Sequence, residues 1–355
     1  MFQQLVTIAH NTFTESIRQP IFVILVLLGA LLMVLAPQLA AYTMEDDNKM
    51  LIDMGMSTIF FMCLLLSAFT ATGVFSNEIE NKTVLTVVSK PVSRPLFVVG
   101  KYLGVSVAIS LAFFLLSTVL VLAIRHRVMS TASDHFDMPV ILFGVGGALF
   151  AIIFATAANY LYNKVFTSTL AVVLLITQAI ALGLVLVINK KWGLQSPLTE
   201  FTDHGGELTQ VIVGLGLVFQ AVLVLTGVAV AASTRLGQVM TLMICVGVFL
   251  LGLASNSLSQ MVNSRLSIPI GTDYYQSLSA IMHADLALYQ KVVYAAAKFL
   301  YMLVPNLQFF WSADAITQGT PITAGLFGLV SGYAALQVMA VLAVAVALFQ
   351  NREVG

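Results

Sequence analysis

The sequence has few charged residues and almost no cysteine. Only 9% of its 355 residues are Asp, Glu, Lys or Arg, whereas 59% are hydrophobic. An average soluble domain has about 25% charged residues, so this composition excludes a water-soluble fold and indicates a protein of the lipid bilayer. The 16 basic residues are balanced by 16 acidic ones. Without a basic excess, binding to a nucleic-acid backbone is not expected.

The two cysteines, Cys63 and Cys245, both lie inside apolar runs. There they act as small hydrophobic residues, and two cysteines supply neither a disulfide framework nor a four-ligand metal site. We therefore predict no metal and no cofactor in this chain.

Eight apolar runs are long enough to cross a bilayer, because a helix needs about 20 apolar residues to span roughly 30 Å of hydrocarbon. The predicted spans are Ile21–Leu39, Met54–Phe75, Leu96–Ile124, Pro139–Leu161, Phe166–Ile188, Val211–Ala232, Val239–Leu258 and Ile322–Phe349. They predict an all-α polytopic membrane protein, with residues 1–355 in a single domain. A cleaved signal peptide is disfavoured, since the segment before the first run is about twenty residues long and contains Glu15.

A ninth run, Leu286–Val304, differs because Lys291 and Lys298 lie on one helical face with Tyr294 and Tyr301. Two lysines in lipid would cost about 2.5–3.5 kcal/mol each, so this run predicts an interfacial helix. It belongs to an external segment, residues 259–321, that we expect to cap the outer mouth of the bundle.

The distribution of basic residues predicts that both termini are cytoplasmic. An even number of spans places them on one side, and the short loops of that side hold eight Lys and Arg residues against five opposite. Four of the eight lie between Lys82 and Lys101.

Residues 1–19 predict an amphipathic helix along the membrane plane. Its apolar face consists of Phe2, Leu5, Val6, Ala9, Phe13 and Ile17. Pro20 biases Gln19 away from helical geometry, so we expect an elbow between this helix and the first span.

The predicted spans contain no Asp, Glu, His or Arg, and their only lysine is Lys101, near the inner end of the third. Ion-coupled transporters and voltage sensors depend on such groups, so their absence argues against these classes. No span offers the residues of an intramembrane protease, and no Gly-rich loop ends in Gly-Lys-Ser/Thr. We predict that the chain is not an enzyme and does not bind nucleotide.

The polar groups left in the spans are few. For Gln178 and Gln220, hydrogen bonds between helices are favoured over contacts with a substrate, although a facilitator pathway along the two is an alternative. The small residues Ala324, Gly328 and Gly332 recur at four-residue spacing. They predict a close helix contact, either within one chain or between two.

The loop between the second and third spans, residues 76–95, is the most distinctive polar segment. Asn77 with Glu80 three residues later predicts the start of a short helix, with carboxylates in its first turn. Pro91 would end this helix, and Pro95 fits the first turn of the next span.

At this loop the sequence resembles the permease subunits of type-2 ABC exporters, in particular the group of the permease for nitrous-oxide-reductase maturation. The resemblance rests on Glu78-Ile79-Glu80-Asn81-Lys82-Thr83, on Ser89-Lys-Pro-Val-Ser-Arg-Pro95 and on Gly100-Lys-Tyr-Leu-Gly104. Weaker likenesses are Leu303–Phe310 and the ending Leu348–Gly355. The eight predicted spans exceed the usual six.

The resemblance implies two permeases side by side, either two copies or two paralogues, in a bacterial plasma membrane. Each would bind a cytoplasmic ABC ATPase subunit that holds ATP and Mg²⁺. Glu78, Ile79, Glu80, Asn81, Lys82 and Thr83 would form the coupling helix that docks on the ATPase, and the helix around Leu5 to Phe13 would flank it. The alternatives are a membrane scaffold that binds partners through the same loop and an ion-independent facilitator.

Overall fold

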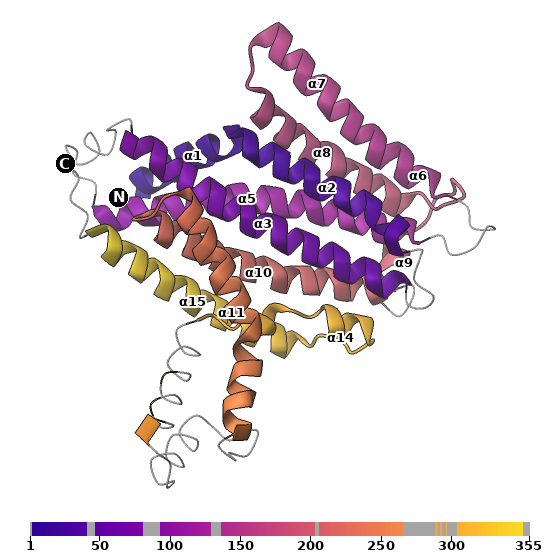
Figure 1. Cartoon of the computed structure of the whole chain (residues 1–355). Helices are drawn as coiled ribbons and strands as arrows, with labels where there is room; N and C mark the ends of the chain where they lie inside the picture. Colours follow the sequence, from indigo (N-terminus) through magenta and orange to yellow (C-terminus); the bar gives the residue numbers. More distant parts are fainter. Residues whose placement is uncertain are drawn as a thin grey trace.

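The computed structural model describes residues 2–40, 47–80, 93–128, 136–202, 206–265 and 304–350, together with 288, 289, 292 and 296. These residues form a bundle of long helices (Figure 1). The elements are α1 (Phe2–Arg18), α2 (Pro20–Ala40), α3 (Asp47–Glu80), α5 (Arg94–His126), α6 (Met138–Val140), the π-helix η1 (Ile141–Val145), α7 (Gly146–Tyr162), α8 (Phe166–Val187), α9 (Pro197–Thr202), α10 (Glu207–Ser233), α11 (Gln238–Arg265), the 3-10 helix η3 (Leu307–Phe310), α14 (Ala313–Thr317) and α15 (Ala324–Gln350).

Eight helical segments within the described ranges are long and apolar enough to cross a membrane. The predicted number of spans is therefore confirmed, and the chain is an all-α polytopic membrane protein. The fourth span, Met138–Tyr162, is composite: α6, η1 and α7 follow one another without a break.

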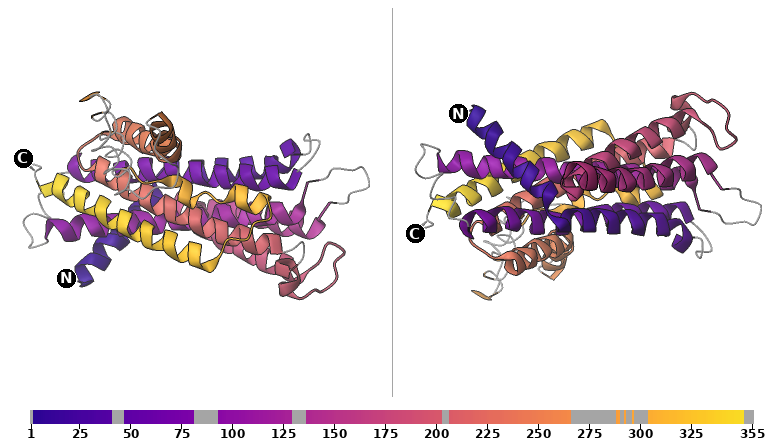
Figure 2. Two further views of the ribbon diagram at one scale, coloured as in Figure 1. Left: turned by 90° about the horizontal axis from the view of Figure 1, so that it is seen from below. Right: turned by 90° about the horizontal axis from the view of Figure 1, so that it is seen from above.

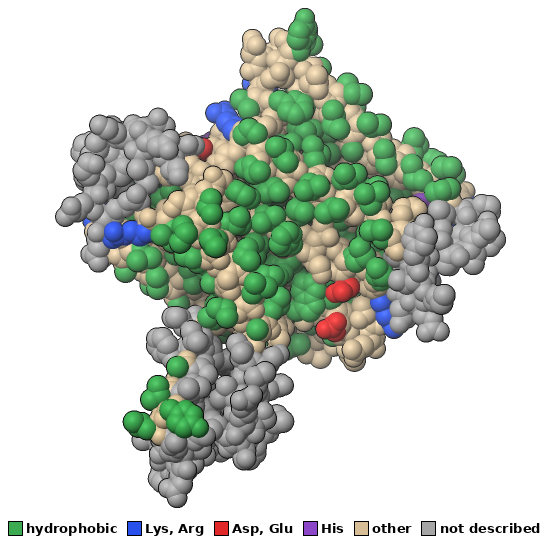
Figure 3. Space-filling model, in the orientation of Figure 1, with side chains coloured by type: hydrophobic (Ala, Val, Ile, Leu, Met, Phe, Trp, Pro, Cys, Tyr) green, Lys and Arg blue, Asp and Glu red, His purple; other side chains and the backbone are tan. Residues whose placement is uncertain are grey.

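Three helices form the centre of the bundle. In α3, α5 and α10, 72%, 61% and 67% of the most apolar stretch is buried, against 17% in α15. The Ser67 and Thr226 hydroxyls join α3 to α10 across the core at 2.9 Å. The outer helices expose their apolar side chains, which cover the middle of the face in Figure 3, with charged groups toward its edges. This is the surface expected of a protein whose solvent is lipid.

The long helices run between two ends of the bundle, as both views of Figure 2 show. One end, here called the terminal end, carries α1, the last turn of α3, the first turn of α5 and the last turn of α15. The other, the opposite end, carries the turns from α5 to α6 and from α8 through α9 to α10. The described helices thus begin and finish at the same end, as an even number of spans requires.

The helix boundaries confirm some details of the sequence prediction and correct others. α1 and α2 are separated at Gln19, and α5 begins after Ser93 with Pro95 in its first turn, as predicted. The predicted helix start at Asn77 is wrong, because α3 is continuous from Asp47 to Glu80. No proline or glycine interrupts the chain there, and extending a helix costs less than nucleating a new one.

The predicted external segment, residues 259–321, is described in part. Helix α11 continues to Arg265, whereas the predicted interfacial helix Leu286–Val304 lies almost entirely outside the described residues. The final part packs into the bundle: Leu307 and Phe310 are buried, and a Cβ on Gly252 would lie 2.7 Å from the Leu307 side chain.

Candidate functional site

Helix α1 approaches α5 so closely that only glycine fits at two positions of α5. A Cβ on Gly104 would lie 2.4 Å from the Cβ of Thr12 and 2.5 Å from the carbonyl oxygen of Ala9. A Cβ on Gly100 would lie 2.8 Å from Ile8. Glycines at four-residue spacing let two helix backbones meet in lipid. Helix α1 therefore packs against the segment Gly100-Lys-Tyr-Leu-Gly104 of α5.

The buried face of α1 matches the predicted apolar face in part: Ile17 is buried as predicted, but two polar residues are buried as well. Thr12 and Ser16 are fully buried, and the Ser16 hydroxyl donates to the carbonyl oxygen of Thr12 at 2.7 Å. Of the predicted elbow residues, Leu5, Ala9 and Phe13 are half-buried, whereas Val6 is 49% exposed. Sequence reasoning missed Thr12 and Ser16; the signal was small residues at four-residue spacing, matched by the glycines of α5.

The elbow that follows α1 contacts two more helices. The Gln19 side chain lies against α3, where a Cβ on Gly73 would be 2.7 Å from the Gln19 Nε2 atom. On α8, the Thr167 hydroxyl donates to the carbonyl oxygen of Arg18 at 3.0 Å. Helix α1 thereby joins α3, α5 and α8 at the terminal end.

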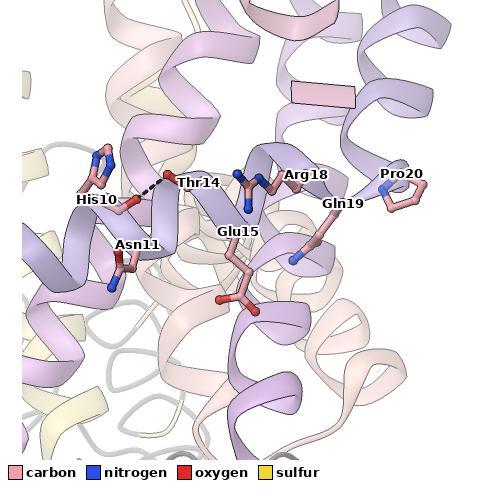
Figure 4. A pocket seen from close by; sticks show the side chains of 7 residues that line it. All are labelled: His10, Asn11, Thr14, Glu15, Arg18, Gln19 and Pro20. Atoms are coloured by element: carbon pink, nitrogen blue, oxygen red, sulfur yellow. Dashed lines mark hydrogen bonds between the residues drawn. The ribbon is translucent and has the colours of Figure 1, made fainter. Parts of the chain in front are cut away.

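The outward face of α1 borders a polar pocket of about 570 Å³. Figure 4 shows that its lining side chains come from α1 and the turn into α2. They are His10, Asn11, Thr14, Glu15, Arg18, Gln19 and Pro20. The pocket combines acidic, basic and amide groups at the surface, which suits contact with a polar partner better than contact with acyl chains.

Two arginines bind the last carbonyl groups of α15. Arg94, the first residue of α5, donates to the carbonyl oxygen of Gln350, and Arg235, just after α10, donates through Nε to that of Leu348 at 2.8 Å. Cations at a helix C-terminus complement the helix dipole and satisfy carbonyls that have no partner within the helix. The ends of α5, α10 and α15 are thus tied together.

Aromatic rings connect the same helix ends. Phe97 of α5 stacks on Phe349 of α15 with ring centroids 5.4 Å apart, and meets Phe75 of α3 edge-on at 6.3 Å. Lys101 is buried beside them, with its Nζ atom 5.6 Å from the centroid of Phe97. Because α3 precedes residues 81–92 and α5 follows them, these rings link the two flanks of that segment.

The predicted docking residues lie at the edge of what the structure describes. Glu78, Ile79 and Glu80 belong to the helical backbone of α3. Their side chains, together with Asn81, Lys82 and Thr83, lie outside the described residues. Both flanks of the predicted docking segment nevertheless end at the terminal end of the bundle.

The polar residues predicted inside the spans bond to neighbouring helices. Gln178 of α8 donates to the carbonyl oxygen of Gly144 in η1 at 2.8 Å, and Gln220 of α10 donates to the Ser331 hydroxyl of α15 at 2.8 Å. These are the interhelical hydrogen bonds that the sequence favoured for both. Within the described part of the chain, no three His, Cys, Asp or Glu residues gather as metal ligands do.

The small residues of α15 face outward. Ala324, Gly328 and Gly332 are exposed, and a Cβ on either glycine would meet no atom within 4 Å. Within the described residues this face packs against no other helix of the chain.

An ionic cluster at the opposite end was not predicted. Arg125 lies 3.3 Å from the Oδ2 atom of the fully buried Asp137 and 3.1 Å from the Oε1 atom of Glu200. Asp137 also accepts the backbone N–H of Val140 at 3.3 Å, and Glu200 accepts the Gln195 amide at 2.7 Å. The cluster joins α5, α6 and α9. These residues belong to separate turns in the sequence, so only the fold brings them together.

Comparison with known proteins identifies the family. Residues 21–238, more than half of the chain, match the family described as ABC-2 family transporter protein. The chain belongs to this family and is a membrane component of an ABC transporter. No curated protein matches its sequence.

Proposed function

We propose that the chain is the permease subunit of an ATP-driven exporter and that residues 78–83 dock on a separate cytoplasmic ATPase. The ATPase would bind ATP and Mg²⁺, and this chain would carry its movement into the membrane. Membership of the ABC-2 family supports the permease role. The resemblance of the loop to type-2 exporters, including the nitrous-oxide-reductase maturation group, supports the direction of transport.

The observation that carries the proposal is the set of contacts around the flanks of residues 81–92. The segment is joined covalently to α3 and α5, and those helices contact α1 through Gln19 and Gly104 and α15 through Phe349. A displacement of the segment therefore acts on four helices at once. A contact network of this kind transmits a movement when its helices adopt two discrete packings.

The mechanism follows from the absence of Asp, Glu, His and Arg from the predicted spans, whose one lysine is Lys101. Without intramembrane carboxylates or histidines, an ion gradient has no evident group on which to act. In the proposal, closure of paired ATPases on ATP displaces the terminal end, and the spans change between inward-facing and outward-facing packings. The polar pocket beside α1 would lie next to the docked ATPase.

Two further features complete the proposal. The terminal end faces the cytoplasm of a bacterial cell, as the basic residues between Lys82 and Lys101 suggest.

The outward small-residue face of α15 receives a second permease, either another copy or a paralogue, because such a face lets two backbones approach closely.

Charge reversal of the docking helix tests the proposal. Glu78→Lys and Glu80→Lys, introduced together, should abolish copurification of the chain with its coexpressed ABC ATPase partner. The physical reason is that the introduced lysines would repel a basic ATPase surface, which is the surface that the proposed contact with Glu78 and Glu80 requires.

The matched control is Asp314→Lys, which reverses an exposed carboxylate of α14, far from the terminal end. It should leave copurification at the wild-type level. Full-strength complex formation by the Glu78 and Glu80 variant would rule out docking through this segment.

A further inference from the structure

A second pocket, of about 460 Å³, lies within the membrane-spanning part of the bundle. It is a groove, partly open to the membrane, between α2, α5, α8 and the composite span of η1 and α7, and its walls are mainly aliphatic. Representative lining residues are Leu31 and Val34 of α2, Val119 of α5 and Ala148 of α7. This pocket is separate from the terminal end and from the contacts used in the proposed function.

The depth of the pocket corresponds to one leaflet of a bilayer. On α2 its lining runs from Leu27 to Gln38, and on α5 from Leu115 to His126. Eleven residues of helix rise by about 16 Å, which is roughly half of the 30 Å hydrocarbon thickness. Gln38 and His126 are close to the ends of α2 and α5 at the opposite end of the bundle. The pocket therefore lies at the level of the leaflet on that side.

The two ends of the pocket differ in polarity. At its membrane surface, Gln38 and His126 are part of the lining, and the Nδ1 atom of His126 is buried without a hydrogen-bond partner among the described residues. At its deep end the one polar side chain of the lining, Gln178, already donates to the carbonyl oxygen of Gly144. A ligand would thus meet a polar rim, where the Nδ1 atom of His126 can still form a hydrogen bond, and an apolar interior.

The size of the pocket restricts what fills it. A helix about 10 Å wide and 16 Å long would occupy on the order of 1,200 Å³, more than twice the volume present. A single extended hydrocarbon chain is far narrower. The volume also falls within the roughly 300–1,000 Å³ of small-ligand sites.

We propose that this pocket binds one acyl chain of a phospholipid from the leaflet at the opposite end, with the lipid headgroup beside His126. The chain length, the aliphatic walls and the polar rim all match this occupant. The proposal goes beyond the transport function and does not depend on it, because it concerns a lipid held by the permease alone.

Photolabelling in vesicles tests the site. The purified full-length chain is placed in vesicles of phosphatidylethanolamine and phosphatidylglycerol that contain a trace of phosphatidylethanolamine with a diazirine on one acyl chain. After irradiation, labelled peptides are identified by mass spectrometry. Label should concentrate on α2 and on the span from η1 to α7, above the level on the lipid-exposed face of α15.

Ala148→Trp fills the pocket and should reduce labelling of the α2 peptides at least about fivefold, because a close-packed interior leaves no room for the lipid chain. Leu149→Trp is the matched control: Leu149 is the next residue of α7, is 55% exposed and does not line the pocket. It should leave the labelling unchanged. If Ala148→Trp does not yield a monodisperse protein, Ala30→Phe fills the same pocket from α2.

Two results would overturn the proposal. One is equal labelling of α2 and α15 that neither filling variant changes, which means that the lipid is only part of the annulus. The other is the absence of label from α2 and from the span from η1 to α7 while α15 is labelled, which means that something other than lipid covers the pocket.

Discussion

The two ends of α5 are held by different kinds of contact. At the terminal end, Gly104 lets α5 meet the backbone of α1, Arg94 donates a hydrogen bond to the exposed end of α15, and Phe97 contacts rings from two other helices. At the opposite end, Arg125 is paired with Asp137 and Glu200. Dispersion contacts are individually weak and non-directional, whereas a buried ion pair is costly to break. We therefore predict that α5 is anchored at the opposite end and that the terminal end is the part that moves during transport.

Removing the ion pairs of Arg125 should cause the largest loss of stability. Arg125→Ala leaves the fully buried Asp137 without its ionic partner, and such a loss costs about 3–5 kcal/mol. We expect a large fall in the thermal unfolding temperature of the purified chain. Lys191→Ala, which removes an exposed lysine from the same end, is the control and should change stability little. Equal stability of the two variants would contradict the anchor.

Overpacking the terminal end should have a smaller effect. Gly104→Ala places a methyl group within 2.4 Å of Thr12, and overpacking of this kind costs about 1–3 kcal/mol. We expect α1 to separate from α5, detected as faster proteolysis of α1, and less ATPase copurification. Gly325→Ala, on the open face of α15, is the control and should be neutral or stabilising by up to about 1 kcal/mol through helix propensity. Unchanged proteolysis of the Gly104 variant would show that the close approach has no role.

The smallest effect is expected in the middle of the bundle. Thr226→Val removes the hydroxyl contact with Ser67 between α3 and α10. Interhelical hydrogen bonds in membranes contribute about 0.6 kcal/mol on average and up to roughly 1.7, so the unfolding temperature should fall only slightly. If Thr226→Val lowered the unfolding temperature as much as Arg125→Ala does, the contact between α3 and α10 would hold the bundle as strongly as the ion pairs do, which would contradict the comparison.

The spans were predictable because hydrophobic length and the exclusion of charged residues together decide whether a helix crosses a bilayer. The elbow at Pro20 and the first turn of α5 at Pro95 were predictable for a local reason, since proline restricts its own and the preceding residue. The predicted helix start at Asn77 was wrong because the capping pattern considers only local residues. The preceding helix α3 already includes Phe75 and continues through Asn77, so no new helix begins there.

The contacts between helices were not predictable in the same way. Thr12 is buried because Gly104, about ninety residues later, leaves space for it. Arg125, Asp137 and Glu200 meet because α5, α6 and α9 converge. In both arrangements the residues that meet lie far apart in the sequence, so no single stretch of it shows which residues are partners. The predicted docking residues Asn81, Lys82 and Thr83 lie outside the described residues and stay a prediction.

The central claim, that residues 78–83 face the cytoplasm and receive the ATPase, is tested most directly by labelling Asn81→Cys with maleimide. The native Cys63 and Cys245 are buried and give little background. In intact cells the introduced cysteine should react with a membrane-permeant maleimide, resist an impermeant one, and lose its reactivity in membranes when the ATPase is bound. Labelling by the impermeant reagent, or reactivity that the bound ATPase does not change, would contradict the account.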